Sequence, residues 1–123
     1  MKILIIGESC LDIFTYGSAD RLCPEAPVPV FKQEDSVTFM GMASNVHRNV
    51  LACLNNLGEK AEVDIKSNQS TGAKVRYIDS NSNQMFLRVD SDEYEEINKL
   101  KLREAEVWSY DAVIVSDYNK GYL

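Results

Sequence analysis

Short apolar runs separated by polar turns predict an α/β chain. Residues 2–7 form a run of branched apolar side chains that ends in glycine, which is typical of a parallel strand buried on both faces. Residues 112–116 repeat this pattern. Residues 44–57 carry apolar side chains at helical spacing, with Ser44 placed to cap the helix and Gly58 to end it. The sequence therefore predicts a small, mainly parallel sheet with helices.

Other segments alternate between apolar and polar residues and predict a second sheet. Residues 12–16 form a half-exposed strand that Gly17 is expected to end, and residues 36–40 form another strand candidate. Residues 74–79 and 84–89 flank a turn-forming Ser-Asn-Ser-Asn sequence, so we expect a β-hairpin.

The remaining segments give weaker signals. Residues 23–31 hold all three prolines and should be extended or lie at a sheet edge. Residues 63–65 predict a short strand, which a loop at 66–71 follows. Residues 92–107 predict a weakly amphipathic helix, supported by Glu95 and Lys99 four positions apart.

The composition of the chain argues against some classes of binding partner. The chain has 123 residues, 13 Lys and Arg against 19 Asp and Glu, and a formal charge of -6. The length suits one domain, and the acidic balance argues against nucleic acid or anionic membrane partners. We find no apolar run long enough for a membrane helix and no signal-peptide pattern, so a cytoplasmic location is expected.

The sequence lacks the spacing of common metal and nucleotide motifs. Cys10, Cys23 and Cys53 include no close pair, which favours a reduced compartment, and together with His47 they lack the paired spacing of a zinc site. The glycines form neither a dinucleotide fingerprint nor a Walker loop. We therefore expect no metal and no cofactor bound by this chain alone.

Two positions are candidates for ligand binding. Asp12 follows the end of the first strand, where ligands bind in open parallel sheets and where a carboxylate can accept hydroxyl hydrogen bonds. The alternative is a solvated aspartate in a turn. Gly41 and Asn45 open the predicted helix, where a backbone can approach a ligand, although helix entry alone could explain both residues. Sugar hydroxyls suit both positions.

A set of motifs extends along the whole chain. It comprises IIGESCLD at 5–12, RLCPEAPVPV at 21–30, FMGMASNV at 39–46, the stretch 84–90 and VSDYNKG at 115–121. Together they resemble the ribokinase-like (PfkB-type) carbohydrate kinases, and within them the N-terminal part of the heptose-7-phosphate kinase domain of ADP-heptose synthases. The segment at 21–30 is the most specific to the heptose branch.

This resemblance implies a truncated ribokinase-like domain over residues 1–123, with lid segments at about 12–40 and 74–90 that form a β-sheet. It also implies that the chain binds a sugar or sugar phosphate. The residues that would contact it are Asp12, Gly41 and Asn45, with Arg88 or Lys120 near the phosphate, although both could also be solvated surface residues.

The chain departs from the family pattern in three places. The family has two glycines where this chain has Gly41 and Met42, and a further strand and helix where it has only residues 59–73. The family's Gly-Ala-Gly-Asp loop, catalytic Asp and ATP pocket have no counterpart here. We therefore assign no catalytic residue, expect ATP and Mg²⁺ only in complete family members, and predict no kinase turnover by this chain alone.

An alternative function is a non-catalytic interaction module built on the lid. An apolar lid face would need a cover, which a second copy could supply in a homodimer. The side chains expected on that face are Phe14, Tyr16, Val28, Val30, Phe39, Tyr77, Phe86 and Leu87. A third and weaker reading is a small nucleotide-binding α/β domain, against which the missing glycine fingerprint speaks.

Overall fold

The computed structural model describes residues 1–68, 72–91 and 98–123. The chain divides into two compact units, each of which is described by itself. The sheet unit comprises residues 1–10, 40–72 and 92–123, and the lid unit comprises residues 11–39 and 73–91. That residues 1–123 form a single domain remains a prediction.

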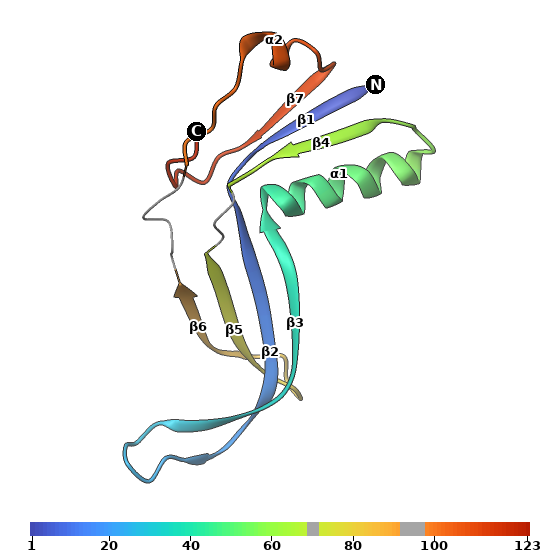
Figure 1. Ribbon diagram of the computed structural model, residues 1–123. Helices are drawn as coiled ribbons and strands as arrows, with labels where there is room; N and C mark the ends of the chain where they lie inside the picture. The colour runs from blue at the N-terminus through green and yellow to red at the C-terminus, as the bar shows by residue number, and fades with distance from the viewer. Residues whose placement is uncertain (69–71, 92–97) are drawn as a thin grey trace. The chain divides into compact units, whose positions relative to one another are not determined.

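The sheet unit is built on three parallel strands in the order β4-β1-β7 (Figure 1). They span Lys2–Gly7 (β1), Glu62–Lys66 (β4) and Ala112–Ser116 (β7), each close to its predicted range. Leu4 is in register with Asp64 on one side and Val113 on the other. The central strand β1 is buried because both of its edges are paired, whereas Val115 on the outer strand β7 is 60% exposed.

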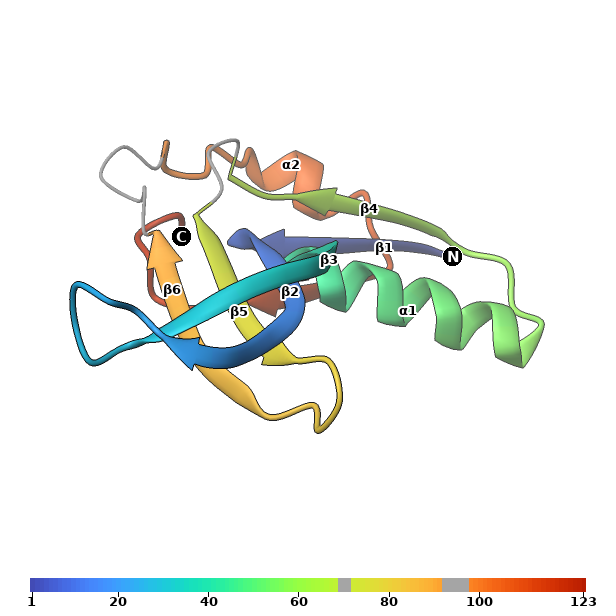
Figure 2. The same cartoon turned by 90° about the horizontal axis from the view of Figure 1, so that it is seen from below.

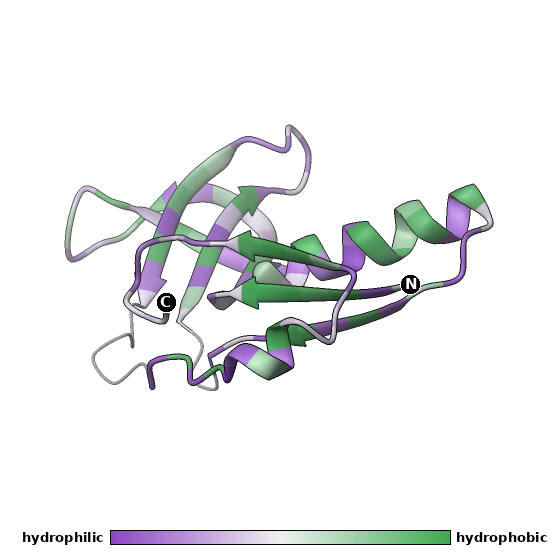
Figure 3. Cartoon of the chain, turned by 90° about the horizontal axis from the view of Figure 1, so that it is seen from above, coloured by the Kyte–Doolittle hydropathy of each residue, from purple (hydrophilic) through white to green (hydrophobic). Residues whose placement is uncertain are grey.

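Hydrophobic residues are concentrated in these strands (Figure 3). On one face of β1, Leu4 and Ile6 pack with the buried Tyr122, and Leu100, Leu102 and Tyr110 border this cluster. Ile3 and Ile5 point to the opposite face because side chains alternate along a strand. The helix α1 lies along that sheet (Figures 1 and 2). The predicted class, an α/β fold with a small parallel sheet, is confirmed.

Helix α1 spans Ala43–Leu57, and Gly58 ends it in the left-handed conformation with φ 70°, as predicted. The predicted cap at Ser44 is wrong. The N-cap residue is Met42, whose φ is 56°, and no side chain caps the helix. Ser44 lies inside the first turn, and its hydroxyl group contacts the Ser9 hydroxyl at 2.7 Å. Burial beside Ser9 therefore gives Ser44 a different partner.

The lid unit contains a four-stranded sheet in the order β3-β2-β5-β6. Its strands span Ser9–Leu22 (β2), Pro29–Met42 (β3), Ala73–Asp79 (β5) and Met85–Ser91 (β6). β5 and β6 form the predicted antiparallel hairpin, and β2 lies parallel to β5.

Gly17 does not end a strand, contrary to the prediction, but lies inside β2. A Cβ atom at this position would lie 2.1 Å from the Lys32 carbonyl oxygen and 2.8 Å from the Phe31 ring. Glycine is therefore needed for the close approach of β2 and β3 and not for a turn.

The prolines lie as expected for an edge strand. Residues 23–28 connect β2 to β3, with a hydrogen bond from the Cys23 N–H to the Val28 carbonyl at 2.8 Å. Pro29 is the first residue of β3, which lies at the edge of the sheet. The separate strand predicted at 36–40 belongs to this one long strand.

The helix predicted at 92–107 is wrong over residues 98–103, which have no regular structure, and right over Glu104–Val107 (α2). Residues 92–97, with Glu95, lie outside the described residues, so that part of the prediction is not tested. Leu100 and Leu102 pack against the sheet instead. The loop predicted at 66–71 begins one residue later than predicted, because Lys66 is the last residue of β4. Residues 67–68 are irregular as predicted, and residues 69–71 lie outside the described ranges.

Across the ranges that the structure describes, no helix is both long enough and apolar enough to span a membrane.

Substitution of Leu4 by Ala tests the packing of the sheet unit. Leu4 is 0% exposed, so removing its side chain leaves a cavity, and we expect the free energy of unfolding to fall by about 2–5 kcal/mol. Leu57 is the matched control because it is 70% exposed. Leu57→Ala should change the free energy of unfolding by less than about 0.5 kcal/mol. Urea unfolding measures both. Equal losses would contradict the assignment of the core.

Candidate functional site

Asp12, the predicted sugar-binding carboxylate, lies in β2 within the lid unit. Its Oδ1 accepts a hydrogen bond from Arg76 Nη1 at 2.6 Å, and both side chains are 22% exposed. The alternative of a solvated aspartate in a turn is therefore wrong. Because the ion pair uses Oδ1, the other carboxylate oxygen can still accept a hydrogen bond from a ligand.

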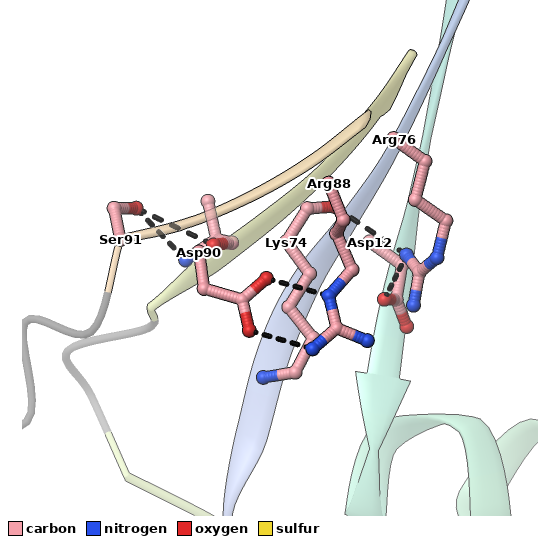
Figure 4. A network of polar contacts seen from close by, with 7 residues as sticks. Asp12, Lys74, Arg76, Arg88, Asp90 and Ser91 are labelled. Carbon is pink, nitrogen blue, oxygen red and sulfur yellow. Dashed lines mark hydrogen bonds and ion pairs between the residues drawn. The ribbon is translucent and has the colours of Figure 1, made fainter. Parts of the chain in front are cut away.

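The strand register places several charged side chains on the same face of the lid sheet, shown in Figure 4. Asp12 is in register with Lys74 of β5, and Lys74 is in register with Asp90 of β6. Arg76 stands directly opposite Arg88. Residues in register share a face, as do residues two apart on one strand. We call these five residues the charged lid face.

Arg88, the second predicted site residue in this unit, forms a two-bond ion pair with Asp90. Its Nε and Nη2 donate to the two carboxylate oxygens at 2.8 Å and 3.0 Å. The charged lid face thus holds three cationic and two anionic side chains, a formal charge of +1 in a chain whose total is -6. It is a locally positive surface on an acidic protein.

Arg76 is fixed from two sides. Besides its bond to Asp12, its guanidinium carbon lies 4.9 Å from the centre of the Phe14 ring, which is cation–π distance. Arg76 was not predicted from the sequence as a candidate site residue. Its two-residue spacing from Lys74 on a predicted strand was the available signal.

The start of α1 holds Gly41 and Asn45. Gly41 is buried near the end of β3, and Asn45 is exposed on the first turn of the helix. Between them Met42 takes φ 56° where the family pattern has a glycine. A residue with a side chain rarely adopts this backbone conformation, which costs about 1–3 kcal/mol. The backbone geometry expected of the glycine is therefore present although the residue differs.

Lys120 lies in the loop that follows β7. Its backbone N–H donates to Glu8 Oε1 at 3.1 Å, and the Tyr118 N–H donates to Glu8 Oε2 at 2.9 Å. Glu8 follows β1 directly and is 0% exposed. Glu8 was also not predicted from the sequence, where its only signal was an ionisable side chain at the end of a buried strand.

Glu8 is ionised at neutral pH. Burial alone would raise the pKa of its carboxyl group, but hydrogen bonds from the N–H groups of Tyr118, Lys120 and Tyr122 outweigh this effect and hold the pKa below 4.5. The pKa of the Tyr122 phenol is raised by its own burial and by the negative charge of Glu8.

A buried polar network lies beside Glu8. Asn68 Oδ1 accepts the Ser9 N–H at 2.6 Å, and Asn68 Nδ2 donates to the Ser9 carbonyl at 3.2 Å. The Ser67 hydroxyl donates to the Ser9 hydroxyl at 2.6 Å, and this group also contacts Ser44. These bonds connect the ends of β1 and β4 to the start of α1.

The predicted site residues divide between the two units. Asp12 and Arg88 belong to the lid unit, and Gly41, Asn45 and Lys120 belong to the sheet unit. The structure brings Asp12 and Arg88 onto one face, and through Glu8 it ties the Lys120 loop to the start of α1. A cavity of about 550 Å³ in the sheet unit is lined by none of the five.

The chain matches known proteins over almost its whole length. It is 37% identical to the bifunctional protein HldE of Caulobacter vibrioides over 98% of this chain and 30% of that protein. It is 32% identical to HldE of a Nitratiruptor species over 99% of this chain and 32% of that protein. No protein-family model matches.

Among solved structures, a ribokinase homologue of Agrobacterium tumefaciens matches with a TM-score of 0.50 at 18% identity. The match covers 93% of this chain and 44% of that one. The fold is ribokinase-like. The predicted resemblance to ribokinase-like carbohydrate kinases, with the heptose kinase branch nearest, is thereby confirmed, and the chain is related to sugar kinases.

The chain spans about 30% of the length of the curated relatives that it matches. The alignment with the Caulobacter protein covers 147 positions, whereas 98% of this chain is about 121 residues, so about 26 positions have no counterpart here. This agrees with the expectation that the chain is shorter than the family pattern within the aligned region.

Glu8 should give the protein a measurable sensitivity to acid. Because its pKa is depressed in the folded state, its stabilisation is present above the unfolded pKa near 4.5 and is lost as the pH falls through the folded value. We expect Glu8→Gln to be less stable at pH 7 and to lose less stability between pH 5 and pH 3 than the unmodified chain.

Urea unfolding at a series of pH values measures this difference. Other carboxylates with lowered pKa, such as Glu106 beside Lys66, titrate equally in both proteins and cancel. Parallel pH profiles for the two proteins would show that Glu8 does not contribute.

Proposed function

We propose that this chain is the sugar-binding and lid portion of a carbohydrate kinase of the heptose kinase type, and that its ligand is a sugar phosphate. The charged lid face carries the proposal, because it combines a carboxylate suited to hydroxyl groups with guanidinium groups suited to phosphate. The relation to bifunctional HldE proteins supports it.

The chemistry of the charged lid face suits a ligand that carries both hydroxyl and phosphate groups. The Asp12 carboxylate is already fixed by Arg76, so it can accept a sugar hydroxyl without first becoming ordered. Arg88 presents a guanidinium fork that is 49% exposed. A phosphate group can take the place of the Asp90 carboxylate on the Arg88 guanidinium. The guanidinium then exchanges one anionic partner for another and stays paired throughout.

The sheet unit supplies a second group of proposed contacts. Asn45 is exposed and offers both a donor and an acceptor to sugar hydroxyls. Gly41 lies just before the helix, where a backbone can approach a ligand. Lys120 lies in a loop whose backbone Glu8 holds, and its ammonium group suits a phosphate.

No step of phosphoryl transfer is assigned to this chain. Complete kinases of this family imply ATP and Mg²⁺, but the described residues contain no group of three or more His, Cys, Asp or Glu side chains placed to hold a metal ion. The sequence also offers no glycine-rich phosphate loop. We therefore give ATP and Mg²⁺ no ligand here and propose binding without turnover.

Calorimetric titration with heptose 7-phosphate tests the proposed function. We expect binding with no ATP consumption, and an affinity at least tenfold weaker in Asp12→Ala because the hydroxyl acceptor is lost. Arg88→Gln should weaken the sugar phosphate but leave the unphosphorylated heptose unaffected. Asp20→Ala changes an exposed carboxylate on the same strand and serves as the control.

The proposal fails if neither sugar binds at millimolar concentration, or if Asp20→Ala weakens binding as much as Asp12→Ala. Hydrolysis of ATP on addition of the sugar phosphate would contradict the proposal of binding without turnover.

A second candidate function, homodimerisation through the lid, is favoured by the face opposite the charged one. A groove of about 490 Å³ is lined there by apolar side chains, namely Ala19, Val28, Pro29, Phe31, Tyr77, Phe86, Leu87 and Val89. The Phe31 ring packs edge-on against Tyr77 at 5.2 Å and against Phe86 at 5.9 Å. Leu87 is 56% exposed and Phe86 45% exposed.

A β-bulge contributes to this groove. The register places Leu87 opposite Tyr77 and Met85 opposite Ile78, which leaves Phe86 as the extra residue. A bulge turns an extra side chain out of strict alternation, so Phe86 and Leu87 both line the groove. The apolar face is therefore wider than the sequence pattern alone predicts.

The expected composition of the apolar face needs correction, because only Val28, Tyr77, Phe86 and Leu87 of the eight expected side chains line the groove. Phe14 and Phe39 pack edge-on at 5.9 Å, but Phe14 lies under Arg76, in register with it on the charged lid face. Phe14 therefore faces away from Tyr77, the next residue of β5.

Light scattering at micromolar concentration tests the lid dimer. We expect the unmodified chain to be dimeric and Leu87→Glu to be monomeric, with a dissociation constant raised at least tenfold, because the substitution places a charge in the apolar groove. Leu57→Glu, at an exposed position in the sheet unit, should leave the dimer intact. A monomeric unmodified chain removes this candidate function.

A further inference from the structure

Glu8 is a buried carboxylate with no cationic partner among the residues that the structure describes. Its side chain is 0% exposed, and the ion pairs found in those residues do not include it. Burying an unpaired charge is costly unless hydrogen bonds replace the lost water. Its partners must therefore compensate for its desolvation.

Those partners are alternate backbone N–H groups of the loop at 117–122. Tyr118 donates at 2.9 Å, Lys120 at 3.1 Å and Tyr122 at 3.4 Å. The intervening residues Asn119 and Gly121 have positive φ values of 55° and 90°. Backbone N–H groups that a turn conformation directs into one concavity form an anion-binding nest, and the three N–H groups here converge on one carboxylate.

The backbone of this loop thus forms an anion-binding site. The anion that occupies it is the Glu8 carboxylate of the same chain. Asn119 and Gly121 are residue types that adopt positive φ readily, so the nest forms with little strain. A side chain that arrives from the end of β1, some 110 residues earlier in the sequence, occupies it. No free anion can enter while Glu8 is present.

Glu8 also contacts the start of α1. Its backbone carbonyl accepts the N–H of Ala43, the first residue of the helix, at 2.9 Å. One residue therefore fixes the backbone of the loop that carries Lys120 and the helix turn that carries Asn45.

We propose that Glu8 is a positioning residue, an internal anion that fills the nest of loop 117–122 and thereby holds Lys120 in place for a sugar phosphate. The role assigned to Lys120 rests on the proposed function, whereas occupation of the nest by Glu8 does not. The competing explanation is that the apolar packing of Tyr122 with Leu4 and Ile6 holds the loop by itself.

Chemical rescue of Glu8→Ala distinguishes the two explanations. Removing the side chain empties the nest, and acetate supplies the missing carboxylate at the same place. In ¹H–¹⁵N spectra we expect the amide signals of Tyr118, Lys120 and Tyr122 to shift in Glu8→Ala and to return as acetate is added. The melting temperature should rise with acetate in this variant alone.

The controls separate nest occupation from general effects. Sodium chloride at the same ionic strength should not restore the signals, and Glu59→Ala, which changes an exposed glutamate, should not respond to acetate. Unchanged loop amides in Glu8→Ala, or equal recovery with chloride, would overturn the proposal.

If Glu8→Ala does not fold, Glu8→Gln replaces it. Glutamine keeps one acceptor oxygen but turns an NH₂ group toward the remaining donors, so hydrogen exchange at Tyr118 or Lys120 should accelerate at least tenfold. Exchange as slow as in the unmodified chain would again contradict the proposal.

Titration with heptose 7-phosphate then tests the link to the ligand. We expect Glu8→Ala to bind at least tenfold more weakly and acetate to restore part of the affinity. Binding as tight as in the unmodified chain, with shifted loop amides, would show that Glu8 fills the nest but does not position Lys120. If the unmodified chain binds no sugar phosphate, the proposed function fails, and the acetate response still decides whether Glu8 occupies the nest.

Discussion

The sheet unit depends on the pairing of one strand on both of its edges. β1 hydrogen-bonds to β4 and to β7, and no other strand of the sheet described here has two neighbours. β7 approaches β1 closely at Gly7. A Cβ atom at this position would lie only 2.0 Å from the Ser116 carbonyl oxygen, so a larger residue would not fit. Glu8 and Ser9 leave this strand at the edge where parallel strands end. Their hydrogen bonds then connect that edge to α1, to the end of β4 and to the loop after β7.

The lid sheet differs from the sheet unit, because we propose a function for the side chains on each of its two faces. The five residues of the charged lid face make one face charged, and Tyr77, Leu87 and Val89, which alternate with them, lie on the apolar face. A half-buried strand normally turns its apolar side chains to a core and its polar ones to water. Here Leu87 and Phe86 remain about half exposed although they are apolar, so a covering surface would bury apolar area on this face of the lid.

Local patterns in the sequence were sufficient where one segment determines its own structure. The run at 2–7 and the hairpin at 74–89 were predicted because alternation and turn residues act over a few positions. Ser44 and Gly17 were interpreted wrongly for the opposite reason. The Ser44 hydroxyl is bound by Ser9, and Gly17 is required by the backbone of a neighbouring strand, and neither partner can be read from nearby residues.

The same distinction explains which parts of the candidate site were found. Asp12 and Asn45 lie inside motifs, and a resemblance of motifs identifies them without any structure. Arg76 acts through a partner 64 residues away and Glu8 through one 110 residues away, so their roles follow only from the folded chain. In the sequence, a glutamate after a buried strand is only a weak indication of a special role. In the structure the indication is strong, because Glu8 is buried and forms no ion pair with the residues described.

The distribution of charge bears on how an acidic chain would bind the sugar phosphate that we propose as its ligand. With a formal charge of -6 it repels phosphate at long range, so attraction must come from a local excess of cations. On the charged lid face each guanidinium is held by a carboxylate, which keeps it oriented, and Lys74 supplies the excess positive charge. In the sheet unit the nest after β7 could have bound an anion from solution, but Glu8 fills it. The backbone anion site is thereby used to build the structure, and side-chain cations remain for the ligand that we propose.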